Sequence, residues 1–243
     1  MEICDKEKYE KIMANIDYVY NRDLLPVAFI EYLEHMSSDM NIKPKVIFDI
    51  GSCVQHFYTH AKRIWRDADI YCFDAFSYLK PLYKKTNVNF DNVLLYSDDY
   101  CKIKFYENPL YYGGNTIYRE QTSYFPDTQY KIKETITLDT LVKSKKYPYP
   151  DLIKVDVQGA ELDIIKGASQ CLENASYLIL ELIKDNIDYN RGAYKKHEVI
   201  DYLKNIGWYV LNPAFSGNPV DDDWAFVNVR KLREKQQNLP NVY

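Results

Sequence analysis

Two short apolar runs, each ending on an acid, constrain the fold of this chain more than any other feature. The first is VIFDIG at 46–51 and the second is YCFDAF at 71–76, with Asp49 and Asp74 separated by 25 positions. A buried strand of a parallel sheet reads as such a run, and its carboxyl end opens into the crevice where α/β proteins bind ligands. Gly51 lets the backbone turn tightly, and Asp74 can accept hydrogen bonds from both hydroxyls of a ribose. The spacing therefore predicts a nucleotide-type cofactor site.

The glycine pattern at the first of these turns argues against one class of cofactor. No second glycine stands at 54–56, so the sequence contains no GxGxxG cradle for a pyrophosphate. A dinucleotide is therefore disfavoured, and an adenosine ligand without phosphates, of which S-adenosylmethionine is the common one, fits better. The alternative is a plain strand-to-helix turn in which Ser52 caps the helix.

Composition bounds the class of protein. The chain has 243 residues, 47% of them hydrophobic, and a formal net charge of −4, so no global basic field exists to hold a nucleic-acid backbone. The charged start MEICDKEKYEK lacks the apolar core of a signal peptide, and no apolar run approaches the roughly 18 residues that span a bilayer. We expect one soluble, cytoplasmic domain without nucleic-acid or membrane partners. Its expected parts are a helical extension at 1–44, a core at 45–230 and a polar tail at 231–243.

Cysteine and histidine usage predicts no metal site. The cysteines form no CxxC pair, which indicates free thiols in a reducing compartment: Cys4, Cys53, Cys72, Cys101 and Cys171. The histidines lack a ligand spacing: His35, His56, His60 and His197. A divalent ion bound by Asp156 and Glu181 remains an open alternative.

Hydrophobic periodicity predicts an α/β order of elements. Apolar residues at helical spacing over 7–36 indicate two helices, whose apolar faces we assign to the core or to a homodimer contact. After Pro44, strands and helices alternate, and we expect strands at 46–50, 70–73, 93–96, 102–109, 133–138, 151–157 and 177–182. We expect helices at 57–65, 78–84, 160–172 and 194–206, and a closing antiparallel pair at 208–211 and 224–229.

The segment DLIKVDVQGAE at 151–161 places charges inside an apolar strand. Burying an amine and a carboxylate is costly unless they pair or bind something. Lys154, Asp156 and Gln158 alternate, so an extended segment would place all three on one side. The alternative is that Lys154 extends to solvent and Asp156 only caps the following helix.

These blocks together resemble one family. The combination of DIGS, FDAF, SDD at 97–99, ETITLDTL at 134–141, KVDVQGAELDIIKGA and LILEL is similar to the FkbM family of S-adenosylmethionine-dependent O-methyltransferases, from about residue 46 to 229. KVDVQGAE and the pair Leu138–Asp139 are its most discriminating parts. The resemblance implies a Rossmann-like class I methyltransferase fold, a mostly parallel seven-stranded sheet with an antiparallel last hairpin. It also implies methylation of hydroxyl groups on sugars, glycans or natural products, a deoxyhexose among the candidates.

The resemblance also implies roles for residues of this chain. The cofactor S-adenosylmethionine would contact Asp49, Gly51, Ser52, Asp74, Ala75, Phe76, Ser97, Asp98 and Asp156. The family's first motif usually reads DxGxNxG, and we expect Gln55 to replace the contact of the missing second glycine. The turn at 113–116 matches a GN(S/T) signature and would bind the small-molecule or glycan acceptor through Gly114, Asn115 and Thr116.

Methyl transfer to a hydroxyl needs alignment and a general base. The candidates are Asp156, Lys154 and Glu181, with Glu161 as the next choice. Two rival functions stay open: an RNA cap ribose 2'-O-methyltransferase, which uses similar residues, and a catalytically silent S-adenosylmethionine-binding or scaffold protein, which the altered glycine motif favours.

Overall fold

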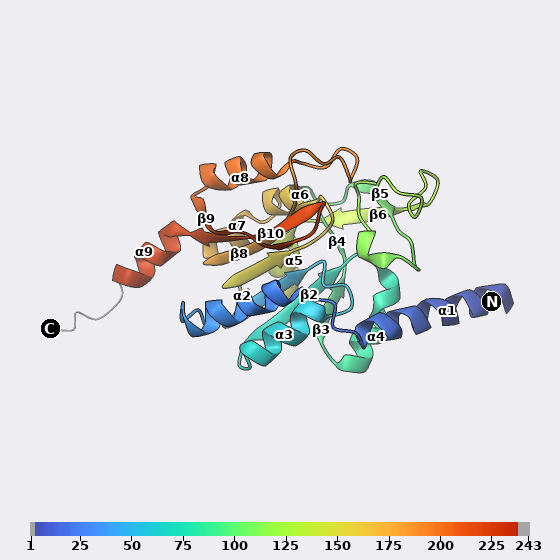
Figure 1. Ribbon diagram of the computed structural model, residues 1–243, viewed down its shortest axis with the longest axis horizontal. Coiled ribbons are helices and arrows are strands. Elements are labelled where there is room, and N and C mark those ends of the chain that lie inside the picture. The colour runs from blue at the N-terminus through green and yellow to red at the C-terminus, as the bar shows by residue number, and fades with distance from the viewer. Residues whose placement is uncertain (1–2, 238–243) are drawn as a thin grey trace.

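The computed structural model of the protein describes residues 3–237, and a seven-stranded sheet lies at its centre (Figure 1). The strand order is β3-β2-β1-β7-β8-β10-β9, and its first five strands run parallel. Strand β10 is antiparallel to both of its neighbours. The strands are β1 Val46–Ile50, β2 Asp69–Asp74, β3 Asn89–Asn92, β7 Leu152–Val155, β8 Tyr177–Ile183, β9 Trp208–Gly217 and β10 Asp221–Asn228. The predicted Rossmann-like class I sheet with an antiparallel last hairpin is confirmed.

Helices cover both faces of this sheet, as the alternating inward positions of its strands require. Phe48, Ile50 and Phe73 point into one apolar core, whereas Ile47 and Cys72 point into the other. The helices on the second side are α1 Ile3–Tyr20, α2 Val27–Ser38, α3 His56–Ile64 and α4 Lys80–Thr86, the last preceded by the 3₁₀ turn η1 Ser77–Leu79. The helices on the first side are α5 Leu138–Lys145, α6 Glu161–Lys166, α7 Ser169–Asn174 and α8 Lys196–Asn205.

The N-terminal helices belong to the core of the same chain. Ile12 and Ile16 of α1 and Phe29 and Leu33 of α2 are at most 2% exposed. Pro26 stands at the N-cap of α2, where its missing N–H costs little. The assignment of these apolar faces to the core is confirmed, and the homodimer contact stays a prediction. No helix among residues 3–237 is long and apolar enough to cross a membrane.

The third strand of the large sheet differs from the prediction. It is β3, with the sequence NFDN, and the expected strand at 93–96 supplies only the short β4 Leu94–Leu95. β3 lies at the sheet edge and is partly exposed, so it carries no apolar run to reveal it. β4 instead joins a small sheet, in the order β4-β6-β5, with β5 Lys102–Tyr106 and β6 Tyr130–Ile136. Between β5 and β6 the chain forms a long segment that contains the 3₁₀ turn η2 Tyr112–Gly114.

The helix expected at 160–172 is two helices, α6 and α7, joined at Gly167. A side chain at Gly167 would overlap the carbonyl oxygen of Tyr96, so the chain passes close to its neighbour there. Asp139 then caps α7: its Oδ2 accepts hydrogen bonds from Ser169 Oγ (3.0 Å) and Gln170 N (2.8 Å). Asp139 itself lies in α5, a helix that we did not predict, because its first turn reads as the end of the strand ETITL.

The C-terminal elements are longer than expected. β9 continues beyond 211 to Gly217, β10 begins at Asp221 and not at 224, and the helix α9 Val229–Gln237 occupies the first part of the predicted polar tail. Asn228 Oδ1 accepts a hydrogen bond from Lys231 N (3.3 Å), which satisfies an N–H group of the first helical turn. The rest of the predicted tail, residues 238–243, lies outside the described residues.

Candidate active site

A cavity of about 360 Å³ opens at the carboxyl ends of the central strands. It lies where the strand order reverses, between β1 and β7, which is the place where open α/β sheets bind ligands. Its volume lies within the usual range of small-molecule sites. The turn after β1, the end of β2 and the end of β7 all contribute to its wall.

The turn after β1 depends on its glycine. Gly51 has a φ of +75° and donates its N–H to the carbonyl of Phe73 (2.9 Å). A methyl group at Gly51 would overlap the carbonyl oxygen of Asp156. Cys53 and Gln55 also have positive φ, of 44° and 71°. The turn is therefore shaped by backbone conformation, and it brings β1 and β7 into direct contact.

Asp74 at the end of β2 holds two backbone groups. Its Oδ2 accepts a hydrogen bond from Cys53 N (2.9 Å) and its Oδ1 accepts one from Phe76 N (2.8 Å). Asp74 and Ala75 line the cavity, and burial raises the pKa of the Asp74 carboxyl. Each carboxylate oxygen retains a free lone pair, so Asp74 can still accept hydrogen bonds from a ligand.

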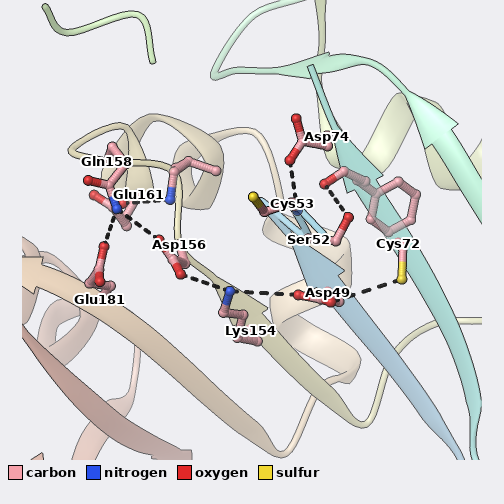
Figure 2. A network of polar contacts seen from close by, with 12 residues as sticks. Asp49, Ser52, Cys53, Cys72, Asp74, Lys154, Asp156, Gln158, Glu161 and Glu181 are labelled. Carbon is pink, nitrogen blue, oxygen red and sulfur yellow. Dashed lines mark hydrogen bonds and ion pairs between the residues drawn. The ribbon is translucent and has the colours of Figure 1, made fainter. Parts of the chain in front are cut away.

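Lys154 of β7 lies between two carboxylates, as Figure 2 shows. Its Nζ is 3.0 Å from Asp156 Oδ2 and 3.7 Å from Asp49 Oδ1, and the residue is 5% exposed. Burial favours the neutral amine, but the charges of Asp156 and Asp49 raise the pKa of Lys154, so it stays protonated. Burial raises the pKa of Asp49 to about 6 against the opposing charge of Lys154. The raised pKa favours the ammonium form of Lys154, and an ammonium ion does not accept a proton.

The pKa values of Asp156 and Glu181 shift in opposite directions. Burial opposes ionisation of Asp156, but the Lys154 ammonium and a hydrogen bond from Glu181 hold its pKa below the usual value. Burial and the charge of Asp156 raise the pKa of Glu181 well above its usual value. The two shifts make Asp156 the stronger acid of the pair and Glu181 the weaker one.

Gln158 joins this pair from an unexpected backbone conformation. Its Nε2 donates to Asp156 Oδ1 (3.1 Å) and to Glu181 Oε2 (Figure 2). The predicted proximity of Lys154, Asp156 and Gln158 is found, but the extended alternation behind it is wrong for Gln158. β7 ends at Val155, and Gln158 has a φ of +58°. A left-handed turn, and not a strand, aims its amide at the carboxylates.

Two further acids, which were not predicted from the sequence, lie near Glu181. Asp223 of β10 lies directly opposite Glu181 of β8, and Asp221 lies two residues before it. Burial raises the pKa of Asp223 to about 8 and that of Asp221 to about 6, and the charge of Asp156 adds to both effects. The DDDW sequence at 221–224 could have revealed these acids. They were left out because the predicted strand began only at Trp224, whereas β10 begins at Asp221.

The segment before β6 holds one buried, oriented amide next to the cavity. Asn115 Oδ1 accepts a hydrogen bond from Asn108 N (2.7 Å), which identifies the other amide atom as the donor Nδ2. This Nδ2 is buried and has no protein partner, and Asn115 lines the cavity. Thr116 also lines it, and its Oγ1 donates to the carbonyl of Gln158 (3.0 Å). The predicted acceptor turn therefore lies beside the predicted catalytic residues.

Several predicted site residues do not line the cavity: Asp49, Gln55, Phe76, Ser97, Asp98 and Gly114. Gln55 Nε2 donates to Thr86 Oγ1 (2.8 Å), and Phe76 is 1% exposed in the core. Ser97 Oγ donates to Asp98 Oδ2 (2.6 Å). Asp49 lies behind the cavity wall and contacts Lys154, which lines the cavity. The segment Val93–Leu95, which we predicted as a strand, lines the cavity instead.

The N-terminal extension also contributes to the cavity, which the sequence did not reveal. Leu24, Leu25 and Pro26, from the linker between α1 and α2, lie in its wall together with Phe57 of α3. The ring of Phe57 is 5.8 Å from Lys154 Nζ. Apolar side chains thus close the side of the cavity next to Lys154.

Glu161, the next candidate base, stabilises the turn that follows β7 by accepting backbone hydrogen bonds. Its Oε1 accepts hydrogen bonds from Val157 N (3.0 Å) and Gly159 N (3.1 Å), and the residue is 3% exposed. Burial raises the pKa of Glu161 to about 7. It does not line the cavity.

The histidines make hydrogen-bond contacts elsewhere in the protein, and the cysteines with described side chains are free. His56 Nε2 lies 3.0 Å from the carbonyl of Val19, and His60 Nε2 lies 2.8 Å from Asp23 Oδ2. Within residues 3–237, no group of three or more His, Cys, Asp or Glu side chains is placed to hold a metal ion. The four cysteines with described side chains are free, and the side chain of Cys4 lies outside the described part. Burial and the charge of Asp74 raise the pKa of Cys53, which makes its thiol a poor nucleophile.

Comparisons with known proteins point to one family. A family model described as the methyltransferase FkbM domain matches residues 49–208. The hexuronic acid methyltransferase AglP of Haloferax volcanii is 41% identical over 49 residues, which span 20% of this chain and 20% of that protein.

Two solved structures are similar at low identity. The methyltransferase FkbM of Methylobacillus flagellatus is 10% identical, with a TM-score of 0.48 over 89% of this chain and 59% of that one. The magnesium protoporphyrin IX methyltransferase of Synechocystis, solved with S-adenosylmethionine bound, is 12% identical, with a TM-score of 0.46 over 83% of this chain and 80% of that one.

Proposed function

We propose that this chain, which belongs to the methyltransferase FkbM family, transfers a methyl group from S-adenosylmethionine to a hydroxyl group of a sugar or glycan. The observation that carries the proposal is the Asp156 carboxyl in the cavity wall, whose Oδ2 lies 3.0 Å from Lys154 Nζ. It is held by Lys154 and lies in the same wall as the free amide donor of Asn115.

The residues present fit the cofactor. When bound, S-adenosylmethionine supplies a methyl group on a positively charged sulfur. The Asp156 carboxylate in the cavity wall suits a cation, and Asp74 retains lone pairs for the hydroxyls of a ribose. Gly51, Ser52 and Asp156 would hold the methionine part. Ala75 and 93–95 would hold the adenine side, because they line the cavity beside Asp74.

The chain's own residues then align and deprotonate the acceptor. Asn115 Nδ2 donates a hydrogen bond to an acceptor oxygen, and Asp156 takes the proton of the reacting hydroxyl on Oδ1. Lys154 keeps Asp156 ionised and in place. Apolar contacts from Phe57 and 24–26 keep water from the reacting oxygen. Alignment of this kind accounts for several kcal/mol of the acceleration in comparable reactions, and a positioned base contributes about 10²–10⁴-fold.

The pairing of Lys154 favours a hydroxyl over a carboxyl acceptor. AglP is by its name a methyltransferase of hexuronic acid, whose carboxylate would need no base. In this chain Lys154 is already paired with the carboxylates of Asp49 and Asp156. It therefore has little capacity left to pair with an anionic acceptor, whereas a neutral hydroxyl gains a base in Asp156.

A methyl-transfer screen over free and nucleotide-linked deoxyhexoses, other hexoses and hexuronates tests the proposal. We expect transfer to neutral sugars, and we expect Asp156→Asn to reduce it by about 10²–10⁴-fold at a cofactor concentration that saturates the variant. Asp201→Asn, on the exposed side of α8, is the matched control. Equal turnover in Asp156→Asn would remove Asp156 as the base, and transfer to hexuronates alone would overturn the choice of a hydroxyl.

The two rival functions give different results in the same assays. Methylation of capped RNA but of no sugar would identify a cap ribose 2'-O-methyltransferase. Calorimetry that detects no binding of S-adenosylmethionine at millimolar concentration would identify a silent scaffold protein.

A further inference from the structure

Two tyrosines of the segment between β5 and β6 lie stacked at the protein surface. The ring centroids of Tyr111 and Tyr124 are 4.4 Å apart, and the ring planes differ by 10°. Tyr111 is 41% exposed and Tyr124 is 53% exposed. Leu110 beside them is 47% exposed. Contiguous apolar surface of this kind marks a binding site more often than an isolated exposed ring does.

The pair is fixed before any ligand arrives. Tyr111 also packs against Phe125, which is 0% exposed, with centroids 6.0 Å apart and planes at 67°. Asn108 Nδ2 donates to the carbonyl of Tyr124 (2.8 Å), and Asn15 of α1 donates to the carbonyl of Leu110 (3.3 Å). Rigid aromatic side chains lose little entropy on binding, so such a pair is preorganised for a flat ligand.

The same segment reaches the active-site cavity. Asn108 N donates to Asn115 Oδ1 (2.7 Å), and Asn115 and Gly113 line the cavity. Asn108 therefore holds Tyr124 through its side chain and the cavity amide of Asn115 through its backbone. The tyrosine pair and the acceptor end of the cavity are parts of one braced segment, beside β5 and β6 in Figure 1.

A sugar ring matches the chemistry of this pair. One face of a pyranose presents C–H groups, whose slightly positive hydrogens pack on the negative face of an aromatic ring, while its hydroxyls remain in water. Tyr111 covers one face of Tyr124, and the exposure of Tyr124 leaves its other face accessible.

We propose that Tyr111 and Tyr124 form a platform for a second sugar ring of the acceptor, next to the ring that receives the methyl group. The acceptor is then a disaccharide or longer glycan. This inference rests on the proposed function, since it extends the same acceptor site.

The double variant Tyr111→Ala/Tyr124→Ala tests the platform, with Tyr149→Ala, a 42% exposed tyrosine in another loop, as the control. The first readout is the KM for methyl transfer to matched pairs of methyl monosaccharides and disaccharides. The second is binding of the protein, loaded with S-adenosylhomocysteine, to an array of the same immobilised sugars. For disaccharides we expect the KM of the double variant to rise about fivefold, with weaker array binding, and for monosaccharides we expect no change.

Each other outcome decides the question. An equal rise in KM for both sugar classes, or no rise for disaccharides, overturns the platform and leaves the proposed function intact. Wild-type protein that methylates monosaccharides but prefers no disaccharide in either assay also overturns it. If wild-type protein methylates no sugar, the proposed function itself fails and the platform fails with it.

Discussion

The two sides of the cavity are built by different means. On the side of β1 and β2, shape comes from the backbone: Gly51 and Cys53 have positive φ, and Asp74 holds two N–H groups. On the side of β7, β8 and β10, ionisable side chains define the wall, and Lys154 lies among buried carboxyl groups. The first side suits a cofactor that is always the same molecule. The second can change its chemistry by exchange of single side chains, so we propose that acceptor specificity lies there.

The largest effect is expected where the two sides touch. Gly51→Ala would place a methyl group on the Asp156 carbonyl in a left-handed conformation, and we expect a loss of about 5 kcal/mol in the free energy of unfolding. Gly207→Ala is the control, because Gly207 has a φ of +89° but no atom within 4 Å of the added methyl, so only about 1 kcal/mol should be lost. Chemical denaturation measures both. Similar losses in the two variants would show that conformation, and not the contact with β7, sets the requirement.

Lys154→Met tests the charged side. It leaves Asp49 and Asp156 without their cation, and removal of one partner of a buried pair costs about 4 kcal/mol. Lys85→Met removes an exposed partner of Asp17 and should change stability by less than about 0.5 kcal/mol. A loss in Lys154→Met as small as that of the control would mean that the carboxyl groups take up protons and need no lysine.

Glu161→Gln tests the same side through pH. Because the pKa of Glu161 rises from 4.5 to about 7 on folding, the folded state binds the proton more tightly, and stability falls as pH rises through that window. The fall amounts to at most about 3 kcal/mol. The substituted amide would keep an acceptor oxygen for Val157 N and Gly159 N, so the variant should lose this pH dependence. Thermal unfolding at pH 5 and pH 8 measures the effect, and an unchanged pH dependence would assign it instead to the other buried acids with raised pKa values, Asp49, Glu181, Asp221 and Asp223.

Asp74→Asn tests the backbone-built side with the smallest change. The variant loses the carboxylate charge but keeps one acceptor oxygen, and we expect cofactor affinity to fall about tenfold with kcat little changed. Asp69→Asn, at the exposed start of the same strand, is the control. Calorimetry with S-adenosylhomocysteine gives the affinity. A large fall in kcat at saturating cofactor would contradict the division of roles between the two sides.

The large sheet was predictable from sequence because its central strands are buried on both faces and read as apolar runs. The elements that were missed lack that signal. β3 is a polar edge strand, and α5 begins on residues that continue a strand pattern. The break between α6 and α7 at Gly167 depends on a contact with Tyr96, which is distant in sequence.

The candidate site divides in the same way. Lys154 and Asp156 stood out because they interrupt an apolar run, and Asp74 stood out because it ends one. Asp221 and Asp223 lie on an antiparallel strand far along the chain, so only the register of β10 with β8 brings them to the site. The linker at 24–26 has no pattern at all, and tertiary packing alone places it in the cavity wall.

Asp139 changes what the family signature means for classification. It is one of the most discriminating residues of the resemblance, yet it lies outside the cavity wall and caps α7. A sequence profile weighted on this aspartate selects chains that share the helical connection after β7, whether or not their catalytic carboxylates survive. A survey that sorts relatives first by Asp156 and Lys154, and only then by Asp139, would separate chains that share only the fold from chains that also keep the candidate site residues.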